Sequence, residues 1–175
     1  MSTKKDDTRE GEGTRGALVA AAALGGLSGA RSLAGPAALA LTRGPRSEID
    51  GALGHPAIAA TVLALAGGEM MADKHPRLPA RTRPAALAGR MMLGGFAGAG
   101  ASAHRGGRPV PGALVGATAA LLAACVTRLA RAGLTRLLRG RPAAAGAIED
   151  VLVIAGGALA RRYLEADDRA GEGTR

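Results

Sequence analysis

Five apolar runs alternate with short polar segments along the chain, at residues 16–42, 51–68, 85–103, 109–127 and 143–160. The second and fourth runs hold 18 and 19 residues without a formal charge. A helix that crosses the hydrocarbon core of a bilayer needs about 20 apolar residues, which rise by roughly 30 Å. The pattern therefore predicts an all-α integral membrane bundle of four or five transmembrane helices, with the fifth run as the weakest span.

Both ends of the chain are polar and mixed in charge, over residues 1–15 and 163–175. Such segments bury too little apolar surface to offset the entropy lost when they become ordered. We expect two disordered polar tails on either side of one transmembrane helical domain, which covers residues 16–162.

The apolar residues of this chain are mostly small. Hydrophobic residues make up 47% of the sequence, yet there is one Phe, one Tyr and no Trp. Small residues let helix backbones approach closely in lipid, and such contacts are also compatible with a homo-oligomer. The scarcity of aromatic residues for the membrane interfaces argues against a membrane protein, so a soluble or peripheral alanine-rich bundle stays as an alternative. Pairs with close-packing spacing are Gly25/Gly29, Gly94/Gly98 and Gly112/Gly116.

The net charge of +9 indicates an anionic partner. Of 23 Lys and Arg residues, 21 lie outside the apolar runs, and no aromatic side chains are interleaved with them to stack on bases. We therefore expect contacts with the lipid bilayer and anionic lipid headgroups, and no nucleic acid. For five spans, 13 cationic residues fall on one side and 8 on the other, which predicts a cytoplasmic N-terminus. A helix lying on the membrane, or a solvated loop helix, is predicted from Arg128, Arg131, Arg136 and Arg139.

A few charged residues interrupt the apolar runs or lie at their ends. An ionisable group in hydrocarbon is costly unless it is paired or faces water, so it marks either a functional path or a structural ion pair. The predicted intramembrane polar site consists of Arg31, Glu69, Asp73, Lys74, Arg90, Glu149 and Asp150.

We expect the two arginines of this site, Arg31 and Arg90, to pair with Glu69 and Glu149 around a polar centre. Asp73 would lie at the mouth of this centre, because it is four residues beyond Glu69 on the same helix face. Lys74 lies beside Asp73, and Asp150 points about 100° away from Glu149, toward an arginine, a neighbour or water. The alternative is that these charges only fix helix packing.

Little in the sequence indicates catalysis. The motifs of zinc hydrolases, P-loop proteins, serine hydrolases and thiol redox enzymes do not occur, and there are only five serines. Cys125 is the single cysteine, so it forms no intramolecular disulfide. The pairs Met70–Met71 and Met91–Met92 are expected to fill gaps between helices and not to conduct copper. No enzyme activity, cofactor or metal site is predicted.

Several stretches resemble a bacterial membrane family catalogued as domain of unknown function 4126: GLSGARSLAGPAALAL (26–41), GEMMADKHP (68–76), LAGRMMLGGFAGA (87–99) and EDVLVIAGG (149–157). The most specific elements are Glu69, Asp73, Lys74 and Pro76, followed by Arg31 with Pro36. The resemblance implies a small multi-helix protein of the bacterial plasma (inner) membrane and brings no known activity.

Two functional hypotheses follow. The first is a small transporter or channel-like protein that moves a small ion or solute past the charged cluster. The second is a structural or assembly protein of the membrane, whose charge pairs fix the helices and whose basic loop binds anionic lipid or a partner.

Overall fold

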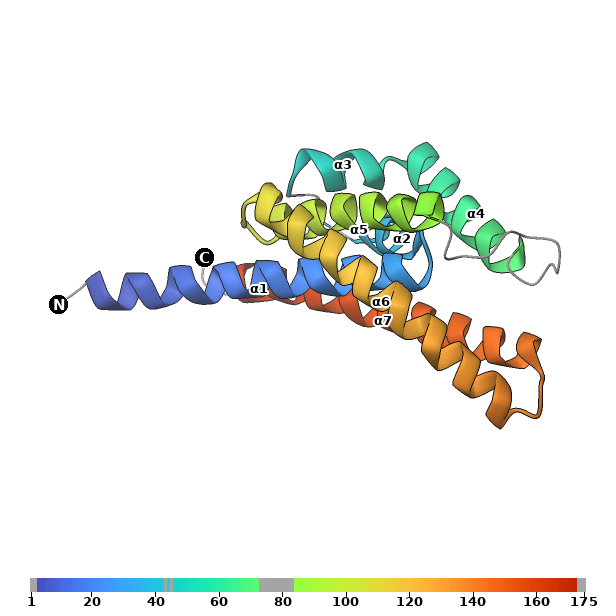
Figure 1. Cartoon of the computed structure of the whole chain (residues 1–175). Helices are drawn as coiled ribbons and strands as arrows, with labels where there is room; N and C mark the ends of the chain where they lie inside the picture. The colour runs from blue at the N-terminus through green and yellow to red at the C-terminus, as the bar shows by residue number, and fades with distance from the viewer. Residues whose placement is uncertain (1–2, 43, 45, 73–83, 173–175) are drawn as a thin grey trace.

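The computed structural model describes residues 3–42, 44, 46–72 and 84–172, with only the helical backbone for residues 3–10 and 167–172. Within these residues the fold is all-α, as predicted, with seven helices and no strands. Three long helices, α1, α5 and α6, pack together at the centre (Figure 1). The helices are α1 (Thr3–Ala30), α2 (Ala34–Ala40), α3 (Glu48–Gly54), α4 (Pro56–Ala72), α5 (Pro84–His104), α6 (Pro109–Leu137) and α7 (Pro142–Glu172).

Two helices are long and apolar enough to cross a membrane: α6 and the Pro142–Ala166 stretch of α7. Helix α3 and the Pro56–Met71 part of α4 meet at 77° and would add a third span if the pair counts as one broken span. Among the described residues this is fewer than the predicted four or five, because α1 begins with charged residues and α5 is diluted by glycine and Arg90. The fifth apolar run, predicted to be the weakest span, belongs to one of the two best.

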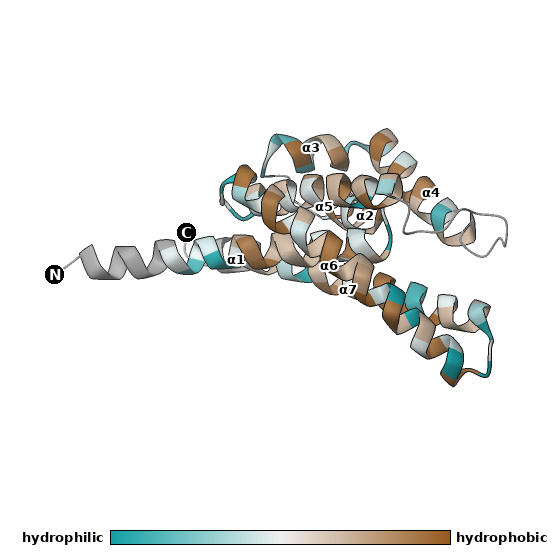
Figure 2. Ribbon diagram, viewed as in Figure 1, coloured by the Kyte–Doolittle hydropathy of each residue, from teal (hydrophilic) through white to brown (hydrophobic). Residues whose placement is uncertain are grey.

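The apolar faces of these two spans point away from the protein. Only 17% of the α6 window and 28% of the α7 window is buried inside the fold. Large side chains such as Leu114, Leu129 and Leu159 are 67%, 73% and 68% exposed. Figure 2 shows apolar residues along much of α6 and α7 and hydrophilic residues toward the ends where the two helices join. Such outward apolar surface indicates a membrane protein.

The first apolar run is two helices and not one span. Helix α1 ends at Ala30, and α2 begins at Ala34 and packs against α1 and α5 (Figure 1). Pro36 explains the break, because its ring would clash with the Ser32 carbonyl and it has no N–H to donate to that carbonyl. Every residue of α2 is buried, so the broken segment lies inside the bundle.

A glycine seam joins α1, α5 and α6. A methyl group added at Gly98 would lie 2.5 Å from the Gly112 carbonyl oxygen, and one added at Gly94 would lie 2.5 Å from the Ala120 side chain. Gly25 of α1 likewise faces the Gly116 backbone of α6. The spaced glycine pairs predicted to mark tight helix contacts therefore all lie in one interface, where the absence of side chains lets three backbones meet. We call Gly25, Gly29, Gly94, Gly98, Gly112 and Gly116 the glycine seam.

The terminal helices reach into both segments that were predicted to be tails. Helix α1 begins at Thr3, and residues 11–15 are helical and exposed. Helix α7 runs to Glu172, and Leu164 is fully buried in the core beside Ala160. A helix that is already nucleated in a packed core extends at little cost, which explains helical backbone in polar sequence.

The predicted surface helix is a continuation of α6. Residues 128–137 extend the same helix without a break, because no proline or other helix breaker follows Thr127. Arg139 lies beyond the helix end with a positive φ of 54°, so it does not belong to the helical cationic face. The C-terminal half of α6 and the N-terminal half of α7 form a hairpin that extends beyond the other helices (Figure 1).

Candidate functional site: a buried network of arginines and carboxylates

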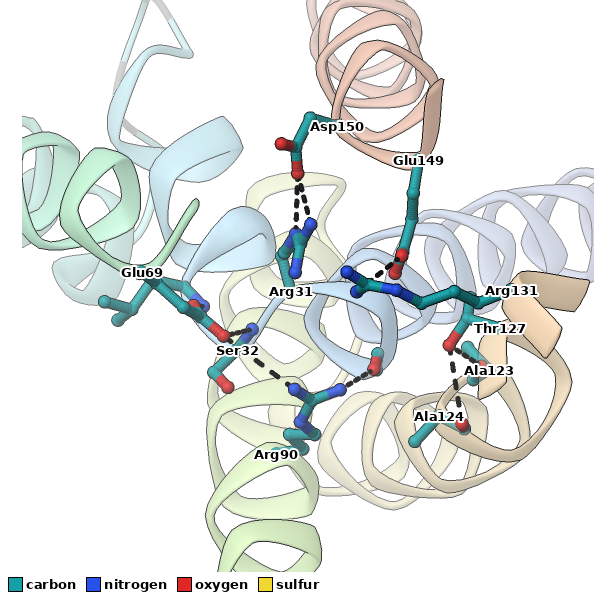
Figure 3. A network of polar contacts seen from close by, with 12 residues as sticks. Arg31, Ser32, Glu69, Arg90, Ala123, Ala124, Thr127, Arg131, Glu149 and Asp150 are labelled. Carbon is teal, nitrogen blue, oxygen red and sulfur yellow. Dashed lines mark hydrogen bonds and ion pairs between the residues drawn. The ribbon is translucent and has the colours of Figure 1, made fainter. Parts of the chain in front are cut away.

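Arg31 lies at the centre of the charged residues, at the point where α1 ends (Figure 3). It is 2% exposed, and its Nε donates a hydrogen bond of 2.9 Å to Oδ1 of Asp150 on α7. Its Nη2 donates to the same oxygen. The pair joins residues 119 positions apart and ties α7 to the helix break. A charge this deeply buried is tolerated because a carboxylate neutralises it.

Glu69 of α4 stabilises the break itself. Its Oε1 accepts a hydrogen bond of 2.9 Å from the Ser32 N–H, and its Oε2 accepts one of 3.2 Å from the Leu33 N–H. The chain turn between α1 and α2 leaves these two N–H groups without a helical acceptor, and buried backbone donors need one. Glu69 therefore replaces the missing helical hydrogen bonds.

Arg90 of α5 approaches the same break next to Glu69. Its Nη1 donates a hydrogen bond of 2.7 Å to the carbonyl oxygen of Gly29, near the end of α1. Its Nη2 lies 3.9 Å from Oε1 of Glu69. Arg90 is 7% exposed, so it is buried together with the backbone carbonyl that it contacts.

A third pair lies on the α6–α7 hairpin. Nη1 of Arg131 donates a hydrogen bond of 3.2 Å to Oε2 of Glu149. Both side chains are partly buried, with 23% and 12% of their surface exposed. Arg131 was predicted to belong to a lipid-facing cationic surface, but it turns inward to this carboxylate (Figure 3).

The structure brings predicted site residues together and adds Arg131 to them. Five of the seven predicted residues converge (Figure 3), where Arg31 pairs with Asp150 and Glu149 pairs with Arg131. The predicted contact of Arg90 with Glu69 is present at 3.9 Å. Asp73 and Lys74 lie outside the described residues. With Arg131 included, the described network holds three cations and three anions.

The partner of Glu149 was detectable in the sequence. Arg131 precedes Gly140 by nine residues, and Glu149 follows Gly140 by nine residues. Two antiparallel helices joined by a tight turn bring equidistant residues to the same height. Gly140, with φ of 77°, lies in that turn and adopts a conformation that glycine accepts readily.

A second buried polar cluster was not predicted at all. Nδ1 of His104, at the end of α5, lies 2.5 Å from Oδ2 of Asp50 in α3, and both side chains are at most 3% exposed. Asp50 also accepts a 2.6 Å hydrogen bond from the Ser47 N–H as part of the capping box that begins α3. No spacing signal links positions 54 residues apart, so only the fold reveals this pair.

Two recesses reach the network from different sides. The larger, which we call the arginine groove, has a volume of about 940 Å³ and lies between Leu87 and Arg90 of α5 and residues 124–136 of α6. The smaller has a volume of about 420 Å³ and lies among α1, α6 and α7, with Glu149 in its wall. Thr127 and Arg131 line both recesses, so the Arg131–Glu149 pair lies where the two approach each other.

The described residues contain no group of three or more His, Cys, Asp or Glu side chains placed to hold a metal ion. The site is therefore described by its ion pairs and recesses. Comparison with protein-family models, with curated proteins and with solved structures finds no match for this chain. The resemblance to domain of unknown function 4126 stays a prediction.

Proposed function

We propose that this chain is a multi-pass protein of the bacterial plasma (inner) membrane, with a cytoplasmic N-terminus, that moves a small ion or solute and is not an enzyme. The observation that carries the proposal is the helix break at Arg31–Leu33, where Glu69 binds the Ser32 and Leu33 N–H groups and Arg90 binds the Gly29 carbonyl just before the break.

Broken helices have a specific meaning in a membrane. Backbone groups without a helical partner are costly in hydrocarbon, and irregular backbone is tolerated there only where protein buries it or where it lines a cavity. Transporters use such breaks to bind ions and substrates with backbone groups. In this chain, Glu69 occupies the two free N–H groups of Ser32 and Leu33. A permeating anion would take the place of that carboxylate at the two N–H groups and separate Glu69 from Arg90.

The two recesses support a path through the network. They share Arg131 and Thr127 and lie on different sides of α6 residues 127–131. Opening of the Arg131–Glu149 pair would join them, and closing would separate them. The 3.2 Å pair then acts as a gate, and its partial exposure makes it easier to open than the Arg31–Asp150 pair.

A structural role is the second candidate, because the described charges balance. Arg31, Arg90 and Arg131 each face a carboxylate, which leaves the network neutral. Buried ion pairs are known to fix register and helix arrangement without binding any ligand. In this case the protein would serve as a scaffold for assembly in the membrane.

Flux through purified proteoliposomes separates the two candidates. Liposomes loaded in turn with chloride, potassium or a proton-sensitive dye would be compared for wild type, Glu69→Gln and the control Glu48→Gln. Glu48 is an exposed acid in the first turn of α3, so Glu48→Gln removes the same charge as Glu69→Gln but away from the break.

Transport predicts a protein-dependent flux that Glu69→Gln changes at least about fivefold and Glu48→Gln leaves unchanged. Absence of flux for all three probes, together with a Tm that Glu69→Gln lowers, would favour the scaffold. A flux that both variants leave unchanged would remove Glu69 from the path.

A further inference from the structure

Two of the arginines that line the arginine groove, Arg128 and Arg136, do not belong to the ion-pair network described above. Four arginines line the groove, and no acidic residue does among the described part of the chain: Arg90, Arg128, Arg131 and Arg136. Arg90 and Arg131 reach it from the network, whereas Arg128 and Arg136 are exposed. The groove therefore presents the positive charge of Arg128 and Arg136 to its surroundings, which favours an anionic occupant.

The walls of the groove are apolar between these charges. Leu87 of α5 and Ala124, Leu129 and Ala132 of α6 form them. A volume of about 940 Å³ is near the upper end of the range for ligand sites, roughly 300–1,000 Å³, and far exceeds what an inorganic ion fills. A molecule that matches both features has an anionic head and an apolar body.

The position of the groove indicates where that molecule comes from. It lies along the last turns of the α6 span, where the charged end of the helix follows an apolar stretch. Helix ends rich in Arg lie at the headgroup level of a bilayer, on the side where acidic lipids attract basic segments. Arg128 and Arg136 are eight residues apart, which places them about 12 Å apart along the helix axis.

We propose that the arginine groove binds one acidic phospholipid, with its phosphate held by Arg128 and Arg136 and its acyl chain against Leu87 and Leu129. Guanidinium groups bind phosphate through paired hydrogen bonds, which a diffuse surface attraction does not provide. This site shares the arginine groove with the proposed transport path but does not depend on transport, because a scaffold protein would bind the same lipid. It differs from the surface helix expected from sequence in that the lipid enters a groove between two helices.

Native mass spectrometry of the full chain in detergent tests the proposal. The probes are phosphatidylglycerol, zwitterionic phosphatidylcholine and inorganic phosphate. The groove variant is Arg128→Gln/Arg136→Gln. The matched control is Arg139→Gln/Arg141→Gln, which removes the same charge from exposed residues that do not line the groove.

We expect wild type to retain a single phosphatidylglycerol, at least about tenfold more tightly than phosphatidylcholine, and the groove variant to lose that preference while the control keeps it. Equal loss in both variants would overturn the proposal, because it would show general attraction to the basic end of the hairpin. The proposal would also be overturned if wild type retained phosphatidylcholine as tightly as phosphatidylglycerol, or if it retained no lipid. Tight binding of inorganic phosphate that displaces the lipid would assign the groove to a small anion instead.

Discussion

The two halves of α6 solve the problem of holding helices together in opposite ways. In the first half, Gly112, Gly116 and Ala120 are buried against α1 and α5, and no charge is involved. In the second half, residues 121–137 include no buried residue, and Arg131 reaches Glu149 of α7 through an ion pair. Small residues bring helices together, and charged pairs reach across where the helices diverge.

This comparison explains why the network lies where it does. Arg31 and Arg90 lie just outside the glycine seam. Gly29 is the last seam residue of α1, and Gly94 lies one turn beyond Arg90 on α5. Side chains as long as arginine need space between backbones, and the seam leaves none. The diverging ends of the helices supply that space, and the carboxylates of α4 and α7 neutralise the charge within it.

Breaking the most deeply buried pair should have the largest effect. Arg31→Met would leave Asp150 in the interior without its cation, which costs about 3–5 kcal/mol of folding free energy. The double variant Arg31→Met/Asp150→Leu removes both charges and should recover most of that loss. Thermal unfolding of the purified protein in detergent measures both, and a double variant as unstable as the single one would contradict the pairing.

Filling the glycine seam should have the next largest effect. Gly116→Ala places a methyl group against the Gly94 and Gly98 backbones and should cost about 1–3 kcal/mol through overpacking. Gly133→Ala in the second half of the same helix meets nothing within 4 Å and should stabilise the helix by up to about 1 kcal/mol. We expect the melting temperature to fall for Gly116→Ala and to rise for Gly133→Ala. Equal shifts would mean that the seam is not close-packed.

Removing the hairpin pair should have the smallest effect of the three. Arg131→Gln disrupts a partly exposed pair, which places its cost at roughly 1–2 kcal/mol, between the values for surface and buried pairs. Arg128→Gln, three residues away and exposed, should change stability by less than about 0.5 kcal/mol. Chemical unfolding of both variants provides the measurement. Equal losses of folding free energy for the two substitutions would show that the Arg131–Glu149 pair contributes no stability of its own.

The sequence predicts helices well in this chain because its apolar runs are bounded by prolines. Pro84, Pro109 and Pro142 each begin a long helix close to the predicted start. The break in the first run was missed although Pro36 lies in it, because a continuous apolar run masked the proline. The described residues hold two or three candidate spans and not the predicted four or five, because α1 begins with charged residues and α5 is diluted by glycine and Arg90.

The sequence predicts which residues gather at the candidate site better than it predicts which of them pair. Unpaired charges in apolar runs must converge, which identifies Arg31, Glu69 and Arg90 from sequence alone. Which carboxylate meets which arginine depends on how each helix is rotated about its axis, and a sequence period does not fix that rotation between different helices. Asp50 and His104 had no signal, since neither interrupts an apolar run.

The account rests on the claim that this network lies within a membrane-embedded helical domain. Carbonate extraction of membranes from cells that express the tagged full chain tests that claim most directly, because alkaline carbonate releases peripheral proteins and leaves integral ones behind. The account predicts that the protein stays in the membrane pellet. Release into the supernatant would contradict it and would make the three pairs ordinary salt bridges of a soluble or surface-bound bundle.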